Sequence, residues 1–415
     1  MIQRTLRALL PSLLLVASVA ALPAWAAAPA AAVLAPDRAP RIGEFVERGI
    51  KANDISGAVT LVARNGKIVH LQAQGLADVA SNRPMRTDSV FRIASMSKPV
   101  TAVAILMLVE EGKLRLEDPL SRFIPAFKDV KVAVAQARPP GAPANAAPPY
   151  YTVPVERPVT VLDILTHTSG IASGPIGNAA AKDLLDNRRK AGTAWAEQLA
   201  TAPLEFQPGT RWAYSPFGAF DVLGRIVEIA SGQRYGDFLQ QRLFKPLRMT
   251  DISFWPDASL RARVVTNYVA SAQGLQPNPD PDQFSSATLD SGAAGLFATA
   301  EAYARFAMML ANGGELDGVR VLSPASVALL GSRIIPDTLP GRAPGEGWGL
   351  GVRSITDRAA RRTLLGTGSF GWSGAYGTHF WVDPQQKLVA ILMVQTPGQS
   401  RTGDFETAVM QAVLP

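Results

Sequence analysis

Residues 91–112 read FRIASMSKPVTAVAILMLVEEG, and the stretch predicts one helix. From Val100 to Val109 nearly every residue is apolar, a pattern typical of a helix buried on all sides. The first turn nevertheless carries Ser95 and, three residues later, Lys98. Residues at i and i+3 share one helix face, so the lysine nitrogen can approach the serine oxygen. An ammonium group beside a hydroxyl at the mouth of a buried helix requires an explanation.

The pair Ser95 and Lys98 has a chemical and a structural interpretation. A serine hydroxyl is a weak nucleophile unless another group accepts its proton, and a lysine removed from water can serve in that transfer because its pKa falls. The helix N-terminus adds free N–H groups that favour developing negative charge. In the structural interpretation, Ser95 caps the helix and Lys98 extends along it toward water. The SxxK spacing alone, which is common by chance, favours the structural interpretation.

The regions around this helix predict strands near both ends of the chain and helices between them. Residues 57–75 predict a hairpin that turns at Asn65-Gly66, and residues 378–395 predict two strands around Asp383-Pro384. The proline-rich stretch 137–149 predicts a surface loop. Further helices are expected at about 42–51, 159–167, 179–201, 218–231, 234–246, 299–312, 323–331 and 404–413. This order indicates an α+β fold, with an antiparallel sheet flanked by helices and an inserted, mostly helical lobe.

The N-terminus resembles a secretory signal peptide over residues 1–26, with Arg4 and Arg7 before an apolar stretch and Ala24-Trp25-Ala26 as the cleavage site. A retained N-terminal anchor is the alternative. Residues 27–39 predict a flexible leader. No other stretch is long and apolar enough to cross a bilayer, so no stable membrane span is expected after cleavage. We therefore expect a periplasmic or secreted protein.

Composition excludes several kinds of chemistry. The 415 residues include no cysteine, which excludes disulfides, a thiol nucleophile and thiolate metal sites. The formal net charge is +7, but the lysines and arginines are scattered along the chain without basic runs, so no nucleic-acid partner is expected. His70, His167 and His379 lack a metal-binding spacing; we expect His70 to be exposed on a strand and His167 to be a hydrogen-bonded turn residue. Neither GxSxG nor a phosphate-binding loop pattern occurs, and no metal or cofactor is expected.

Two further stretches accompany the SMSK segment. Residues 205–233 read EFQPGTRWAYSPFGAFDVLGRIVEIASGQ, and residues 366–395 read GTGSFGWSGAYGTHFWVDPQQKLVAILMVQ. Together these segments resemble the serine β-lactamase-like family, which comprises class C β-lactamases, DD-peptidases and family VIII carboxylesterases. LTHTSG at 165–170 and SGAAGLFATAEAYARFAMMLANGGELDG at 291–318 fit the same family in the expected order. The resemblance covers the chain from about residue 40 onward.

The resemblance implies a β-lactamase/transpeptidase-like domain over residues 40–415. Its α/β lobe is expected at about 40–111 and 285–415, and its helical lobe at about 112–284. The domain would follow the signal peptide and the leader, and a cleft between the two lobes would be a natural place for a site.

The resemblance also assigns roles residue by residue. Ser95 matches the family nucleophile and Lys98 its SxxK partner, and Tyr214 matches the tyrosine that acts with the lysine as general base and later as general acid. The third motif, Trp372-Ser373-Gly374, matches a strand that lines the substrate pocket. The backbone N–H groups of Ser95 and Ala375 would then form the oxyanion hole.

Two positions depart from the β-lactamase and peptidase pattern. Where an asparagine usually ends the second motif, Pro216 has neither a side-chain amide nor a backbone N–H. Where the third motif usually begins with a cationic residue, Trp372 offers an apolar surface. Both changes weaken recognition of an anionic β-lactam or a D-Ala-D-Ala terminus, and both resemble the family VIII esterase branch. The resemblance therefore implies an apolar, substrate-lining pocket around Pro216, Trp372, Ser373 and Gly374.

The resulting expectation is a serine hydrolase that cleaves carboxylic esters through an acyl-enzyme on Ser95, with a small-molecule acyl ester or amide as its substrate. One alternative is a β-lactamase or D-alanyl-D-alanine carboxypeptidase, which would share the mechanism. Another is a catalytically silent member of the fold that binds peptidoglycan or a protein partner. The intact set of Ser95, Lys98 and Tyr214 argues against the silent binder. The sequence leaves the oligomeric state open.

Overall fold

The computed structural model describes residues 34–141, 143, 146–278, 289–398 and 400–414. These residues all fall within one compact unit, Ala32–Pro415. The predicted signal peptide, residues 1–26, lies outside the described residues. Among the described residues, no helix combines the length and the hydropathy that crossing a bilayer requires.

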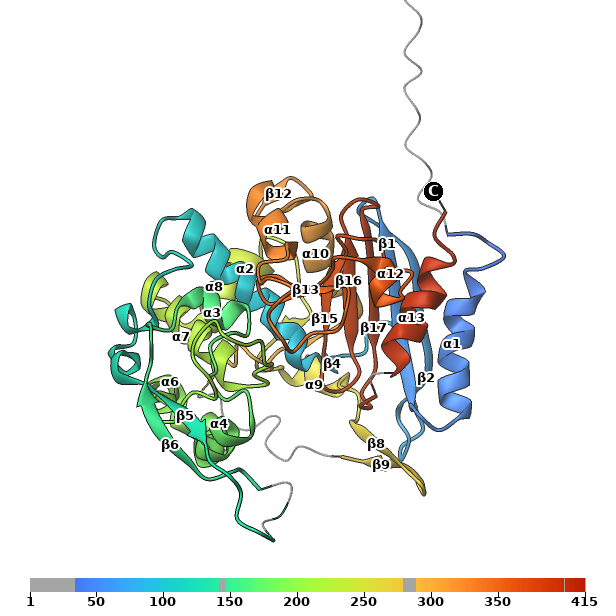
Figure 1. Cartoon of the computed structure of the whole chain (residues 1–415). Coiled ribbons are helices and arrows are strands. Elements are labelled where there is room, and N and C mark those ends of the chain that lie inside the picture. Colours follow the sequence, from blue (N-terminus) through green and yellow to red (C-terminus); the bar gives the residue numbers. More distant parts are fainter. Residues whose placement is uncertain (1–33, 142, 144–145, 279–288, 399, 415) are drawn as a thin grey trace, which may run out of the picture. The chain divides into compact units, whose positions relative to one another are not determined.

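The largest sheet has eight strands, all paired antiparallel, in the order β13-β14-β15-β16-β17-β1-β2-β3. Its strands are β1 (Gly57–Arg64), β2 (Lys67–Asp78), β3 (Arg83–Pro84), β13 (Glu346–Trp348), β14 (Arg353–Ile355), β15 (Phe370–Ser373), β16 (His379–Asp383) and β17 (Leu388–Met393). Strands β1 and β17 lie side by side although they come from opposite ends of the chain, as the blue and red arrows in Figure 1 show. The sheet predicted from the two ends of the sequence is therefore confirmed.

Helices cover both faces of this sheet. On one face lie α1 (Pro40–Lys51) and α13 (Ser400–Met410), and on the other lies α10 (Ala300–Ala311) (Figure 1). Successive residues of a strand point to opposite faces, so Leu61 packs in the α10 core whereas Val62 packs with α1 and α13. Helix α1 meets the sheet through Ile42, Phe45 and Val46, which share one helix face. The sheet flanked by helices agrees with the predicted α+β class.

The helix that carries the SMSK segment is α2 (Ser97–Glu110). Every residue from Ser97 to Leu108 is buried, and the helix packs against α7 (Gly218–Ser231). It ends just before Gly112, whose φ of 68° is the left-handed conformation that suits glycine after a helix. The apolar run on all sides of α2 thus follows from its position between the sheet region and the inserted helices. The predicted buried helix is confirmed from Ser97 onward, but not before it, because Phe91–Arg92 form a short strand and Ala94–Met96 a 3-10 turn.

The segment between α2 and α10 contains short helices joined by loops and short strands. Its helices are α3 (Val161–Leu165), α4 (Pro175–Ala180), α5 (Lys182–Ala191), α6 (Trp195–Leu199), α7, α8 (Tyr235–Leu239) and α9 (Ala258–Ala262). The single helix expected at 179–201 is wrong, because the chain breaks near Gly192, whose φ is 61°. The helix expected at 159–167 is shorter, because it begins only after Thr160, which caps α3. The helix expected at 234–246 is α8 followed by a π-helical turn, Gln240–Phe244.

Short strands and two small helices complete the fold. The proline-rich stretch joins β5 (Lys131–Ala135) to its antiparallel partner β6 (Tyr150–Pro154). A three-stranded sheet pairs β10 (Phe297–Ala298) with β4 (Phe91–Arg92) and β7 (Ile252–Ser253). The remaining elements are β8 (Tyr268–Ser271), β9 (Gly274–Pro277), β11 (Glu315–Leu316), β12 (Val319–Arg320), α11 (Pro324–Gly331) and α12 (Arg358–Arg361). Because β4 leads directly into the Ser95 segment, this small sheet helps to fix the start of α2.

Two further expectations need correction. The flexible leader was placed at 27–39, but Leu34 is buried and pairs as a β-bridge with Val413, and the amide of Ala35 donates to the carbonyl of Ala412. The stretch 27–33 lies outside the described residues. His70 was expected to be exposed, yet its ring is half-buried on β2, and Nε2 lies 2.8 Å from the hydroxyl of Thr60 on the neighbouring strand.

Candidate active site

Ser95 lies in a short 3-10 turn, Ala94–Met96, directly before α2. Ala94 has a φ of 45°, so the chain turns sharply on entering the helix. The Ser95 side chain lines a cavity, and its Oγ accepts a hydrogen bond of 3.2 Å from Lys98 Nζ. The i, i+3 spacing therefore brings the two groups together, as the sequence predicted.

Lys98 is fully buried, with an exposed fraction of 0%. Besides Ser95, its Nζ donates to the main-chain carbonyls of Pro216 at 2.8 Å and of Ala293 at 2.9 Å. Three acceptors thus match the three N–H groups of a lysine ammonium. Lys98 does not extend to water, and the structural interpretation of this lysine as a surface residue is wrong.

Asp221 fixes one of these two carbonyls. It lies buried on α7, and its Oδ1 accepts from the hydroxyl of Ser291 at 2.7 Å and from the amide of Ala293 at 2.9 Å. The carboxylate therefore holds the peptide chain whose carbonyl binds Lys98. Sequence reasoning missed both residues. Ala293 contributes a main-chain carbonyl, which leaves no signature in the sequence, and Asp221 belongs to no motif that the sequence analysis used.

Tyr214 and Trp372 face each other beside this lysine. The indole Nε1 of Trp372 donates to the hydroxyl of Tyr214 at 3.2 Å, and their ring centroids lie 5.2 Å apart. Lys98 Nζ lies 5.0 Å from the centroid of the Tyr214 ring, a distance at which a cation is attracted to the ring face. Helix α2, the 212–216 loop and strand β15 thus bring the three sequence motifs to one place.

Strand β15 ends against the segment that precedes Ser95. The hydroxyl of Thr378 donates to the carbonyl of Ile93 at 3.2 Å, and the amide of Gly374 donates to the carbonyl of Thr378 at 2.7 Å. A Cβ atom on Gly374 would overlap both the Ile93 oxygen and the Thr378 hydroxyl. Ala375 follows directly, is exposed and lines the cavity with Ser95. Its predicted role in the oxyanion hole stays a prediction.

Ser373 points away from Trp372 and contacts a buried ionic network. Its hydroxyl lies 2.8 Å from Nδ1 of His379, whose Nε2 lies 3.1 Å from Oε1 of Glu406. Arg353 donates to the same carboxylate at 2.9 Å. Burial alone would raise the pKa of Glu406, but the hydrogen bonds and positive charges of His379 and Arg353 lower it to about 2. Glu406 is therefore an anion under ordinary conditions.

The cavity above Ser95 has a volume of about 790 Å³. Its aromatic lining includes Trp212, Tyr214, Phe254, Trp255, Phe297 and Trp372. Three arginines also line it: Arg353 and Arg361 both contact Glu346, whereas the guanidinium carbon of Arg92 lies 4.9 Å from the centroid of the Tyr376 ring. Pro216, Ser373 and Gly374 also line it, whereas none of the described residues of the 137–149 loop does. No cluster of three His, Asp or Glu side chains that could hold a metal ion occurs in the described part of the chain.

A profile of the Beta-lactamase family matches residues 42–413, which is most of the chain. The chain belongs to the Beta-lactamase family. This assignment agrees with the fold and with the SxxK geometry described above.

Relatives of this Beta-lactamase family member cover nearly the same length. An uncharacterised protein of Mycobacterium tuberculosis is 38% identical over 363 residues, which cover 82% of this chain and 86% of that protein. Esterase EstB of Burkholderia gladioli is 31% identical over 411 residues, covering 90% of this chain and 95% of the esterase. The solved structure of EstCE1, described as a hydrolase with promiscuous acyltransferase activity, superposes with a TM-score of 0.76 at 24% identity. That match covers 90% of this chain and 98% of EstCE1, and it confirms the predicted β-lactamase-like fold.

Proposed function

We propose that this protein is a carboxylesterase that cleaves small acyl esters through a covalent acyl-enzyme on Ser95. The observation that carries the proposal is the contact between Ser95 Oγ and the fully buried Lys98 Nζ, at the base of an aromatic cavity. A buried lysine with two main-chain acceptors has a fixed position, which suits a group that exchanges protons with one neighbouring hydroxyl. The likeness to EstB supports an ester as the substrate.

The reaction follows from these positions. Ser95 Oγ attacks the ester carbonyl carbon, and its proton passes to the Tyr214–Lys98 pair. The carbonyl oxygen becomes an oxyanion, for which the N–H groups of Ser95 and Ala375 are the donors. The bond to the alcohol oxygen then breaks, Tyr214 donates a proton to that oxygen, and the alcohol leaves. Water next attacks the carbonyl carbon of the acyl-enzyme and gives a proton to the same pair. The bond to Ser95 Oγ then breaks, the pair returns the proton to Oγ, and the acid leaves.

The lining favours neutral acyl groups. Trp372 presents an indole where a cationic residue would face a substrate carboxylate. Of the three lining arginines, Arg353 and Arg361 contact Glu346, and the guanidinium of Arg92 lies over the aromatic rings of Phe297 and Tyr376. Pro216 offers no side-chain amide, but its carbonyl binds Lys98 and so performs part of the task of the missing asparagine. These features support the esterase branch that the sequence suggested, rather than a β-lactamase or a peptidase.

The test uses short-chain p-nitrophenyl esters, a chromogenic cephalosporin and a fluorophosphonate probe read by intact-protein mass. We expect ester turnover and a single covalent adduct in the wild type, with both abolished in Ser95→Ala. Ser332→Ala is the control, because Ser332 is an exposed serine after α11 that does not line the cavity, so its loss should keep the adduct. Fast cephalosporin turnover with slow ester turnover would assign a β-lactamase, and labelling by no probe would support a silent binder.

We also propose that the protein is exported. The first 26 residues carry the features of a signal peptide, which supports this proposal. N-terminal sequencing of the protein from its native cell should find a chain that starts near residue 27. A chain that retains Met1 in the cytoplasmic fraction would contradict export.

A further inference from the structure

One residue makes hydrogen bonds to both neighbours of Tyr214. The carbonyl of His167 accepts from the amide of Ala213 at 3.0 Å, and Nδ1 of the same residue accepts from the amide of Ser215 at 3.2 Å. The His167 ring also lies against the ring of Tyr214, with centroids 4.6 Å apart. His167 therefore holds the amides of the residues before and after Tyr214 and contacts the Tyr214 ring.

The backbone of His167 reaches this position by adopting the left-handed conformation, with a φ of 56°. Its two neighbours hold the turn, since the hydroxyls of Thr166 and Thr168 lie 2.9 Å apart and Thr166 also donates to the carbonyl of Leu162 at 2.7 Å. The amide of Thr168 donates to the carbonyl of Asp163 at 2.8 Å. The turn thus has a single arrangement, which determines where the imidazole points.

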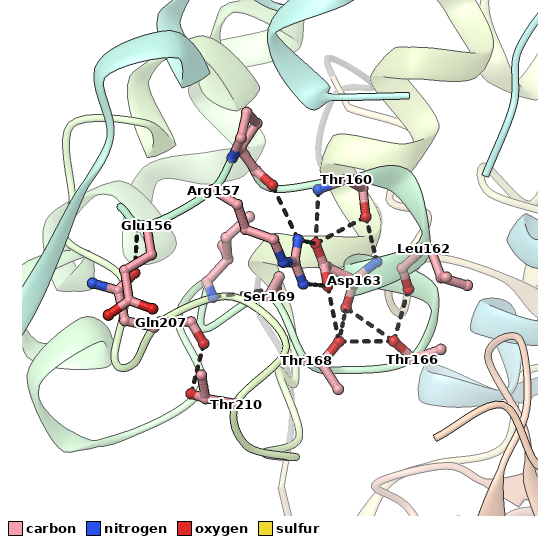
Figure 2. A network of polar contacts seen from close by, with 12 residues as sticks. Glu156, Arg157, Thr160, Leu162, Asp163, Thr166, Thr168, Ser169, Gln207 and Thr210 are labelled. Carbon is pink, nitrogen blue, oxygen red and sulfur yellow. Dashed lines mark hydrogen bonds and ion pairs between the residues drawn. The ribbon is translucent and has the colours of Figure 1, made fainter. Parts of the chain in front are cut away.

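The buried side chain of Asp163 contacts this turn; Figure 2 shows it with Arg157, Thr166 and Thr168. Asp163 receives two hydrogen bonds of 2.7 Å from the guanidinium of Arg157, and its Oδ1 also accepts from the hydroxyl of Thr168 at 3.2 Å. Thr160 and Asp163 in addition cap the start of α3 reciprocally. The ion pair therefore connects the start of α3 to the residue that follows His167.

The hydrogen bond from Ser215 defines the form of the imidazole. Because Nδ1 accepts, it carries no hydrogen, so the ring is neutral with its hydrogen on Nε2. Nε2 is buried without a hydrogen-bond partner among the described residues. The centroid of the His167 ring lies 5.2 Å from that of Phe220 and 5.1 Å from that of Trp348. Burial, together with the ammonium of Lys98, lowers the pKa of His167 well below its ordinary value of 6.5. In an imidazolium, Nδ1 would carry a hydrogen that points at the N–H of Ser215. Burial and the positive charge of Lys98 also oppose the charged ring.

We propose that His167 is a positioning residue, a neutral imidazole clamp that holds Tyr214 in its place for proton transfer at Ser95. The inference rests on the proposed function, because it assigns to His167 a task only if Tyr214 moves a proton. Trp372 holds the Tyr214 hydroxyl from one side, and His167 holds its main chain and ring from the other. A small displacement of a proton-transfer group lowers the rate far more than it lowers substrate affinity.

Two substitutions separate the clamp from the backbone turn. Asparagine and glycine both tolerate the left-handed conformation, but only asparagine can offer an oxygen to the Ser215 amide. We expect His167→Gly to lower kcat for a p-nitrophenyl ester by about 100-fold with KM within about threefold, and His167→Asn to recover most of that loss. His70→Asn, a half-buried histidine on β2, is the control and should leave kcat unchanged.

A double-mutant cycle tests whether His167 acts through Tyr214. Tyr214→Phe should lower kcat by about 100-fold or more. In that background, His167→Gly should lower kcat by less than about threefold further, because the hydroxyl that the clamp positions is already absent. Effects that multiply, or an asparagine variant as slow as the glycine variant, would overturn the proposal. If Tyr214→Phe keeps the wild-type rate, it is the proposed role of Tyr214 that fails.

The wild-type protein supplies an independent measurement should His167→Gly not fold. Nitrogen-15 NMR of the three histidines at neutral pH reports which ring nitrogen carries the hydrogen. We expect His167 as the neutral form with hydrogen on Nε2, and its signals should stay unchanged on mild acidification. A His167 ring with hydrogen on Nδ1, or an imidazolium, would overturn the clamp.

Discussion

His167 and His379 are equally buried, each with an exposed fraction of 1%, yet their surroundings are opposite. Both nitrogens of His379 have side-chain partners, the hydroxyl of Ser373 and the carboxylate of Glu406. His167 has a backbone amide on one nitrogen and aromatic rings around the other, with the nearest charge a cation, Lys98. Equal burial therefore says little about what a histidine does, because the partners of its two ring nitrogens differ from one site to the other.

Strand β15 separates the two histidines. Trp372 points to the Tyr214 hydroxyl and packs against Trp348 at a centroid distance of 4.6 Å, which is on the His167 side. The next residue, Ser373, points to the opposite face of the sheet and contacts His379. One strand thus presents an aromatic surface to the proposed reaction centre and an ionic network to α13. Changes on either side of this strand test how independent the two regions are.

The largest effect is expected from Gly374→Ala, at the end of the shared strand. The new Cβ would overlap the Ile93 carbonyl and the Thr378 hydroxyl, so β15 must move away from the Ser95 segment. We expect kcat/KM for a p-nitrophenyl ester to fall by about 100-fold, because a displacement of about 1 Å has that cost. Gly403→Ala is the control, since nothing lies within 4 Å of its Cβ position. Equal activity of the two variants would show that β15 does not position the site.

A smaller effect, on stability alone, is expected on the His379 side. Glu406→Gln removes the anion that His379 and Arg353 share. The pKa of Glu406 is about 2 in the folded protein against an ordinary 4.5, so its ionised form contributes roughly 3 kcal/mol of stability at neutral pH. Urea unfolding at pH 7 should find a loss of this size, whereas the exposed Glu47→Gln on α1 should change the free energy of unfolding little. A loss below about 1 kcal/mol would mean that the network contributes little.

The smallest expected effect is on the pH dependence of stability, which should differ between the His167 region and the Glu406 region. The folded-state pKa of His167 is lowered, so below pH 6.5 the unfolded chain binds a proton that the folded chain does not. The free energy of unfolding should therefore fall by up to about 1.4 kcal/mol for each pH unit below 6.5, whereas the Glu406 contribution is lost only between pH 4.5 and about 2.

Urea titrations of wild type and His167→Asn at pH 7, 6 and 5 isolate the first of these steps. The variant should show the weaker pH dependence, with the remaining slope due partly to His70, whose burial also lowers its pKa. Identical slopes for the two proteins would contradict a neutral His167 in the folded state. Glu406→Gln should keep the wild-type slope in this range, since its step lies at lower pH.

Much of the fold could be predicted because its signals are local. The apolar run of α2, the Asn65-Gly66 turn and the strands around Asp383-Pro384 each follow from neighbouring residues. The failures have non-local causes. Leu34 looked like part of a flexible leader, because its partner Val413 lies at the other end of the chain. The helix expected across 179–201 ends near Gly192, whose backbone conformation the apolar pattern did not show.

The candidate site divides in the same way. Side chains with a motif, such as Ser95, Lys98 and Tyr214, could be named from the sequence. Groups without one could not, since the carbonyl of Ala293 that binds Lys98 belongs to the main chain. His167 was correctly expected to be a hydrogen-bonded turn residue, but its contact with the peptide after Tyr214 depends on a pairing 48 residues away.

The anchoring of Lys98 by peptide oxygens has a consequence for engineering. A substitution replaces a side chain but never removes a carbonyl, so position 216 can be varied without deleting its bond to the lysine, provided that the loop keeps its path. Pro216 also lines the cavity. Libraries at this position could therefore alter substrate range while the main-chain hydrogen bond to Lys98 stays in place.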